Sequence, residues 1–295
     1  MRDQRHITTT RHSGRREFLA AAGAAMAAFA GRSAVGDDQP QPGTGGVRRP
    51  AAKRPFELGL ASYTLRKFPL DKTLAMTRRV DLKYICLKSF HLPLDATPDQ
   101  IAAVAAKVKA AGITLYGCGV VSMGKPAEVD QAFDYAKAAG MKTIVASPKP
   151  ELLKRIDEKV REFDIQVAIH NHGPGDKIYP TPQSICEKVG DLDKRIGICM
   201  DIGHTLRIGA DPVESARKYA DRLLDIHIKD VSAASPEGQT VEVGRGVIDI
   251  PAFLRALVEI KYRGIVSFEH EKDENDPLAG LAESVGYTRG VLAVI

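Results

Sequence analysis

The chain has 295 residues, of which 44% are hydrophobic and 27% are charged, enough to bury one large core without a second domain. Six of the 42 Lys and Arg residues and two of the 37 acidic residues lie before Asp37, which leaves 36 basic and 35 acidic side chains. This near-neutral balance argues against a nucleic-acid partner. The cysteines have no zinc-ribbon or redox spacing, so buried free thiols are expected for Cys86, Cys118, Cys186 and Cys199.

The N-terminal segment has the order of features found in an export signal. Arg15-Arg16 and Phe18-Leu19 precede an Ala-rich apolar run from Ala20 to Ala30, which is shorter than the about 20 residues of a membrane span. We interpret residues 1–36 as a twin-arginine signal rather than a basic tail, and expect a periplasmic or otherwise exported protein with no transmembrane domain after signal removal. Residues 37–54 are rich in Gly, Pro and Arg and are interpreted as a flexible tether.

From Pro55 onward, short β-prone apolar runs alternate with longer stretches of helical periodicity. Strict alternation predicts a parallel sheet covered by helices, and eight units favour closure into a single-domain (β/α)8 TIM barrel over residues 55–295. The first run is not followed by a Gly-x-Gly-x-x-Gly turn, which disfavours a doubly wound dinucleotide-binding sheet. The predicted strands are Glu57–Ser62, Tyr84–Leu87, Ile113–Val121, Thr143–Ala146, Ile165–His170, Ile196–Met200, Leu224–Ile228 and Ile265–Phe268.

Proline and glycine mark the expected helix boundaries. The pairs Thr97-Pro98, Ser147-Pro148 and Asp211-Pro212 predict three helix starts, because proline is favoured in the first turn of a helix. Gly112 and Gly140 predict two helix ends, since glycine readily adopts the left-handed conformation found there.

Four successive strands end in residue types that bind metals. His170 ends the fifth strand, Asp201 follows the sixth and Glu269 the eighth, and His227 lies on the seventh. Working residues of a barrel project from the carboxyl ends of its strands, so these side chains should meet at one rim and need a partner there. A divalent cation is that partner, and mixed imidazole and carboxylate ligands suit Mn, Co, Zn or Fe better than Ca. For any single residue, a structural strand-end cap is the alternative.

Several motifs of the second half resemble the xylose-isomerase-like TIM-barrel superfamily of sugar isomerases and epimerases. They are Met200–His204, Asp225–Asp230, Gly244–Asp249 and Tyr262–Glu269. The resemblance covers nearly everything after the tether and implies that Asp201, His227 and Glu269 are metal ligands. It also implies a fourth ligand after the fifth strand, where the family has glutamate and this chain has His170.

That departure affects the acid-base chemistry, because the family's two ligating glutamates also move protons in its epimerases. A neutral imidazole bound to a metal cannot accept a proton, so either His170 is a ligand and one base is lost, or another group serves. We expect the catalytic residues among Glu269, His170, His204 and Lys229. The candidates for the missing group lie near predicted strand ends: His172, His204, Lys88, Lys149, Lys229 and Glu271.

The expected function is divalent-metal-dependent isomerisation or epimerisation of an unphosphorylated keto sugar through a stabilised enediolate. Export and the lack of an Arg cluster or Gly-rich nest after the last two strands both disfavour a phosphorylated substrate. A keto-sugar or 3-keto-glycoside lyase or hydratase, or an inosose-type dehydratase, is the alternative, because it needs a strong base on one face only. An endonuclease IV-like phosphodiesterase and a non-catalytic exported sugar-binding protein rank lower. The expected partner is a small-molecule sugar, and a homodimer is the assembly considered.

Other polar features have two interpretations each. Lys229 and Asp230 either orient substrate hydroxyls or form a solvated ion pair at the rim. His91 either faces the pocket or anchors its loop, and Gly244–Gly246 is either a substrate loop or a turn before a helix near Pro251.

Overall fold

The computed structural model describes residues 55–295 of the chain. The interpretations of residues 1–36 as an export signal and of residues 37–54 as a tether fall outside the described residues. Among residues 55–295, none of the helices combines the length and the apolar character that crossing a membrane requires.

Eight parallel strands close into a barrel in the order β1-β10-β7-β6-β5-β4-β3-β2. The predicted (β/α)8 barrel is therefore confirmed, and each predicted strand is present with small shifts at its ends. The four strands that carry the metal-binding residue types, β5, β6, β7 and β10, are consecutive neighbours in this order. The strands are β1 (Glu57–Ala61), β2 (Tyr84–Leu87), β3 (Thr114–Met123), β4 (Thr143–Pro148), β5 (Gln166–His170), β6 (Ile196–Asp201), β7 (Leu223–Ile228) and β10 (Ile265–Phe268).

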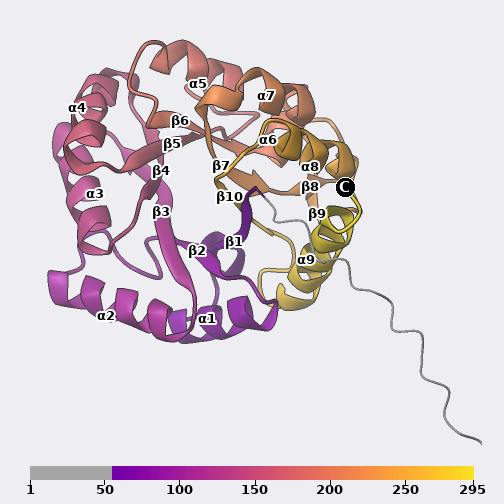
Figure 1. Cartoon of the computed structure of the whole chain (residues 1–295), viewed down its shortest axis with the longest axis horizontal. Coiled ribbons are helices and arrows are strands. Elements are labelled where there is room, and N and C mark those ends of the chain that lie inside the picture. The colour runs from indigo at the N-terminus through magenta and orange to yellow at the C-terminus, as the bar shows by residue number, and fades with distance from the viewer. Residues whose placement is uncertain (1–54) are drawn as a thin grey trace, which may run out of the picture. The chain divides into compact units, whose positions relative to one another are not determined.

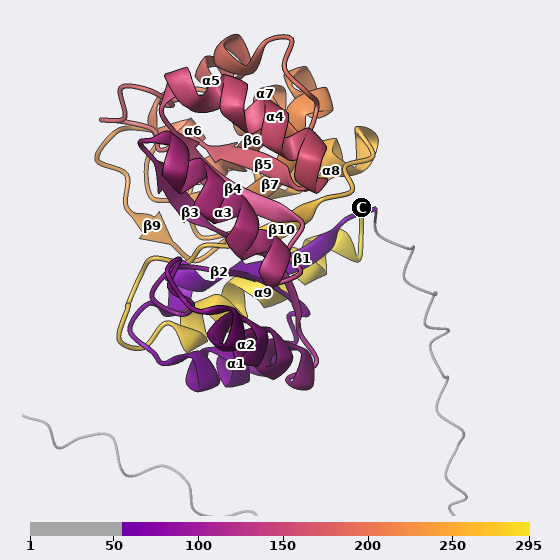
Figure 2. The ribbon, with the colours of Figure 1, turned by 90° about the vertical axis from the view of Figure 1, so that its left-hand side faces the viewer.

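Helices surround the barrel, as Figure 1 shows in one view and Figure 2 from the side. Their apolar faces pack on the strands around large buried side chains such as Phe133, Phe253 and Phe268, and this burial is the main source of stability. The helices are α1 (Leu70–Arg79), α2 (Pro98–Ala110), α3 (Pro126–Ala138), α4 (Leu153–Phe163), α5 (Pro182–Val189), α6 (Ile202–Arg207), α7 (Pro212–Lys218), α8 (Ile250–Glu259) and α9 (Leu278–Leu292).

Most of the predicted helix boundaries are confirmed. Thr97 caps α2 in a reciprocal capping box with Gln100, and the Asp211 carboxylate accepts two backbone N–H groups at the start of α7. Gly112 and Gly140 follow α2 and α3 with φ angles of 70° and 71°, which is the left-handed conformation expected after a helix.

The predicted helix start at Ser147-Pro148 is wrong. Both residues belong to β4 and pair with Ser122 and Met123 at the extended end of β3. β4 continues through both residues because β3 is long enough to pair with them. Pro148 has no backbone N–H, but no hydrogen bond is lost where no acceptor faces that position. A 3-10 turn from Pro150 to Leu152 follows, and α4 begins at Leu153.

A buried carboxylate fixes the connection that follows β7. Asp230 opens a two-stranded antiparallel sheet of β8 (Asp230–Val231) and β9 (Thr240–Val241). Its side chain is fully buried and accepts hydrogen bonds at 2.9 to 3.2 Å from the backbone N–H groups of Val231, Gly244, Gly246 and Ile248. The ion-pair interpretation of Asp230 is therefore wrong, and Gly244–Gly246 is a fixed turn before α8.

His91 anchors its loop, as one of its two interpretations proposed. The ring is buried, with Nδ1 2.9 Å from Ser62 Oγ and Nε2 3.0 Å from both Thr73 Oγ1 and the Phe68 carbonyl oxygen. Both ring nitrogens have partners in the segment between β1 and β2, which includes α1, so His91 holds this part of the rim in place.

Replacing Asp230 with alanine should destabilise the barrel, because four backbone N–H groups lose a buried acceptor at once. We expect the free energy of unfolding to fall by about 3 kcal/mol, since each unsatisfied buried group costs roughly 1–3 kcal/mol. Urea denaturation measures this change. The exposed Asp191→Ala variant is the control and should stay within about 0.5 kcal/mol of the parent. Equal effects of the two substitutions would contradict the anchoring role.

Candidate metal centre

The four side chains predicted as metal ligands meet at the carboxyl end of the barrel. All are buried, and one ligand atom from each of His170, Asp201, His227 and Glu269 lies within 4.8 Å of the other three. His170 Nε2 is 3.1 Å from His227 Nδ1 and 3.7 Å from Asp201 Oδ2. Glu269 Oε2 is 3.3 Å from His227 Nδ1. The structure therefore brings these four side chains together at one position of the rim.

Local backbone structure orients Asp201. It ends β6 and caps α6, with Oδ1 accepting the backbone N–H of His204 at 2.7 Å, so Oδ2 is left to face the cluster. Asn171 supports this arrangement by accepting the Asp201 N–H at 3.1 Å and donating to Thr205 Oγ1 at 3.1 Å. Asn171 was not singled out from the sequence, although a fully buried amide next to His170 is the kind of outer residue that orients a ligand.

Lys229 supplies a positive charge inside the cluster. Its buried ammonium group lies 2.9 Å from Asp201 Oδ2, 3.0 Å from Glu269 Oε2 and 2.5 Å from Glu271 Oε1. Burial alone would lower the pKa of Lys229, but the three carboxylates outweigh burial and raise it well above its ordinary value. The solvated ion-pair interpretation of Lys229 is wrong, because its side chain is only 2% exposed.

Neighbouring groups also shift the pKa values of Asp201 and Glu269. Burial alone would raise the pKa of Asp201, but electrostatic interactions with His204 and Lys229 outweigh burial and lower it. Burial likewise opposes ionisation of Glu269, whereas Lys229 and His227 hold the pKa of its carboxyl well below the usual range. Both groups are therefore carboxylates that offer lone pairs to a cation.

The two imidazoles differ in their electrostatic surroundings. Burial lowers the pKa of His170 to about 3, so this ring is neutral and has a free lone pair. Burial acts in the same direction on His227, but the Glu269 carboxylate outweighs it and raises the pKa of His227. Nε2 of His170 and Nδ1 of His227 face each other, so a proton or a cation must lie between them for both to be satisfied.

These residues fit a divalent cation. With both imidazoles neutral, the carboxylates of Asp201, Glu269 and Glu271 face one ammonium group, which leaves two negative charges in a largely buried site. A divalent cation would neutralise them and satisfy the facing lone pairs of His170 and His227. Two imidazoles and two carboxylates are an ordinary ligand set for such an ion.

The other acid-base candidates lie at different distances from the cluster. His204 Nε2 is 4.0 Å from Asp201 Oδ2, and the His172 ring centroid is 4.4 Å from that of His170, so both border the site. Burial lowers the pKa of His204, which favours its neutral form. Lys88 donates to the Val120 carbonyl oxygen at 3.3 Å, and Lys149 is exposed after β4.

A polar layer lies below the cluster inside the barrel. The hydroxyl group of Tyr116 is 2.6 Å from Ser267 Oγ and 3.3 Å from Asp225 Oδ2, and the Cys199 thiol donates to the same carboxylate oxygen at 3.8 Å. Burial raises the pKa of Asp225 to about 7. This layer is not evident from the sequence, because its members come from four separate strands and have no shared spacing. All four cysteines are free, and Cys86, Cys118 and Cys199 are buried as expected, whereas Cys186 is only partly buried.

A closed β/α barrel with buried imidazoles and carboxylates at the carboxyl ends of four adjacent strands defines the class of TIM-barrel proteins built around a metal-type site. The chain belongs to the family described as Xylose isomerase-like TIM barrel, which it matches over residues 80–291. This family includes sugar isomerases, epimerases and dehydratases, as the resemblance of the motifs implied.

Individual relatives agree with this assignment. Inosose dehydratase of Lacticaseibacillus casei is 28% identical over 137 residues, which cover 41% of this chain and 45% of that protein. The chain spans less than half the length of the curated relatives it matches. The structure of L-ribulose 3-epimerase superposes with a TM-score of 0.67 at 17% identity, over 80% of this chain and 94% of that one. The IOLI protein with a bound zinc atom superposes with a TM-score of 0.65 at 18% identity, over 81% and 98%.

The substitution Lys229→Met should reveal that the site carries more negative than positive charge. Without a cation, the variant buries Asp201 and Glu269 with no ammonium partner, so we expect it to unfold at least about 3 kcal/mol more easily than the parent. Added Mn²⁺ or Zn²⁺ should restore much of this loss, because a cation takes over the neutralising role. Urea denaturation with and without chelator measures both effects.

The matched control is Lys107→Met, which breaks the exposed ion pair with Asp71 at 2.8 Å. This variant should lose little stability, and added metal should stabilise it no more than it stabilises the parent. A Lys229 variant that metal leaves as unstable as before would show that the cluster does not hold a cation.

Proposed function

We propose that the chain is a divalent-metal-dependent sugar isomerase or epimerase that acts on an unphosphorylated keto sugar. The observation that carries this proposal is the convergence of His170, Asp201, His227 and Glu269 on one buried position, with Lys229 beside two of them. Zinc in the similarly folded IOLI protein and the epimerase activity in the name of another structural relative support it. Mn, Co, Zn and Fe are the metals we propose for the position.

His170, Asp201, His227 and Glu269 would hold the cation, which supplies polarisation of a sugar carbonyl and stabilisation of the negative charge that develops on its oxygen. Glu269 Oε2 accepts the carbon-bound proton beside the carbonyl, because this carboxylate is ionised and at the rim. Lys229 Nζ donates to Glu269 Oε2, so it orients the base and holds a proton close to the reacting carbon. His172 and His204 border the site next to His170 and carry a proton on that side of the substrate.

A second candidate is a dehydratase or lyase acting on a keto-inositol, a keto sugar or a 3-keto-glycoside. His170 replaces one of the two carboxylate bases that a symmetric epimerase uses, whereas Lys229 is a buried ammonium group beside Glu269 that can hydrogen-bond to a departing hydroxyl or alkoxyl group. The sequence similarity to inosose dehydratase favours the same reaction. Both candidates share removal of a proton beside the carbonyl and differ in what happens next.

The substrate class follows from the export signal that we propose for residues 1–36. Sugar phosphates are retained in the cytoplasm, whereas an exported enzyme meets free sugars, oxidised sugars and glycosides. The described rim agrees, since the buried ammonium group of Lys229 is already paired with carboxylates and the half-buried Lys88 donates to a backbone carbonyl group.

The purified chain, loaded with metal, should exchange a carbon-bound substrate proton for solvent deuterium. Free ketoses, keto-inositols and 3-keto-glycosides are incubated in deuterated water, and the products are followed by NMR. Deuterium at one carbon with an isomeric product supports the isomerase or epimerase, and release of water or an alcohol supports the lyase. Asp201→Ala and His227→Ala should lose bound metal and all exchange. Metal-dependent exchange with none of these substrates would overturn the proposal.

His170→Glu tests the position where this chain departs from the family pattern. A carboxylate at the end of β5 adds a negative ligand to the cluster, so we expect bound metal to be retained or to bind more tightly. His170→Leu is the matched control and should bind metal at least about tenfold more weakly, because a ligand is lost without replacement. Metal content after dialysis and isothermal titration measure both. Weaker binding by His170→Glu than by His170→Leu would contradict the assignment of His170.

A further inference from the structure

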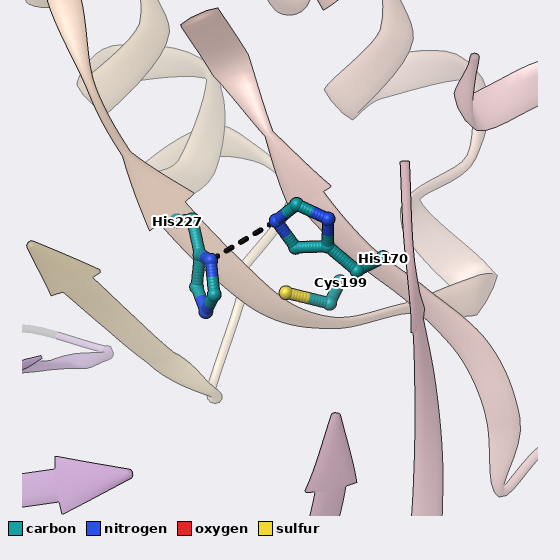
Figure 3. Close-up of side chains that lie close together, drawn as sticks. All are labelled: His170, Cys199 and His227. Atoms are coloured by element: carbon teal, nitrogen blue, oxygen red, sulfur yellow. Dashed lines mark hydrogen bonds between the residues drawn. The ribbon is translucent and has the colours of Figure 1, made fainter. Parts of the chain in front are cut away.

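A cysteine lies directly beneath the metal centre. Cys199 precedes Asp201 by two residues on β6, so it points to the same face of the strand, about 6–7 Å further from the rim. In the strand register it is opposite His170 on one side and Asp225 on the other. Figure 3 shows its thiol beside the facing rings of His170 and His227. One ligand atom from each of these three buried residues lies within 4.8 Å of the others.

We propose that His170, Cys199 and His227 form a second, deeper position for a thiophilic cation such as Zn²⁺ or Cd²⁺. Thiolate sulfur combined with imidazole nitrogen favours soft and borderline cations, whereas Mn²⁺ and Mg²⁺ prefer the oxygen ligands of Asp201 and Glu269. The inference uses two imidazoles of the proposed metal centre but does not depend on the sugar reaction.

Groups inside the barrel can accept the proton that Cys199 releases when it binds a metal. Coordination breaks the S–H bond of Cys199 and forms a sulfur–metal bond. The displaced proton passes to the Asp225 carboxylate, whose Oδ2 accepts the thiol hydrogen bond at 3.8 Å. Tyr116 and Ser267 surround that carboxylate with hydroxyl groups, so the protonated acid also has partners. No oxidant or other reactant is required.

The two positions exclude each other. Both need the lone pairs of His170 Nε2 and His227 Nδ1, which lie 3.1 Å apart and can serve one ion at a time. An ion held by Cys199 lies below Asp201 and Glu269, away from the rim where substrate enters. A thiophilic cation such as Zn²⁺ would therefore be active when it is held at the rim and inactive when it is held by Cys199, while a cation that prefers oxygen remains at the rim.

X-ray absorption of the chain with one equivalent of Zn²⁺ tests the sulfur ligand directly. We expect a zinc–sulfur distance of about 2.3 Å together with nitrogen ligands at about 2.0–2.1 Å. The sulfur contribution should disappear in Cys199→Ser and persist in Cys186→Ser, which removes the partly exposed thiol of α5. A parent protein with no zinc–sulfur contribution, or a Cys199→Ser variant that keeps it, would overturn the proposal.

Metal affinities give an independent readout. Cys199→Ser should bind Zn²⁺ at least about tenfold more weakly and Mn²⁺ within about twofold of the parent, because only the thiophilic ion uses sulfur. Retained Mn²⁺ binding also shows that the variant is folded. An equal loss of affinity for both ions would contradict a separate position. If the sugar reaction is absent while zinc–sulfur bonding is present, the proposed function fails and this inference stands.

Discussion

The compensation of buried charge decides how the centre of this barrel is organised. Asp201 and Glu269 are carboxylates at positions with almost no access to water, and the free energy of burying two such charges unpaired would exceed the stability of a typical domain. Lys229 meets both of them, yet with Glu271 present one ammonium group is too little to neutralise three carboxylates. A divalent cation bound through the facing lone pairs of the two neighbouring imidazoles would neutralise the remaining negative charge.

The barrel and its four main site residues follow from local features of the sequence. Alternation of β-prone runs with amphipathic stretches determines the fold class, and parallel strands place their carboxyl ends at one rim, so His170, Asp201 and Glu269 had to be neighbours. The sequence alone did not determine the direction in which the polar side chains after β7 point. Lys229 turns inward to the carboxylates, whereas Asp230, one residue later, turns to backbone N–H groups that come from more than ten residues away.

Two other features depended on tertiary partners. Ser147-Pro148 has the composition of a helix start, but the long β3 strand extends the pairing to include both residues. Asn171 is a single amide between two histidines, and its role becomes visible only when α6 brings Thr205 within reach. Local propensity and spacing identify which residues carry chemistry, while packing between distant segments determines which of them are held rigid.

The hairpin of β8 and β9 has one further consequence. Its base is held to the barrel in part by the carboxylate of Asp230, and the stretch between the two strands contains exposed residues such as Ser232 and Glu237. Changes in length at its tip would leave the backbone of β7, and with it His227 and Lys229, undisturbed. During evolution the rim can therefore acquire new loops that suit bulkier ligands, while the buried ionic centre is inherited without change.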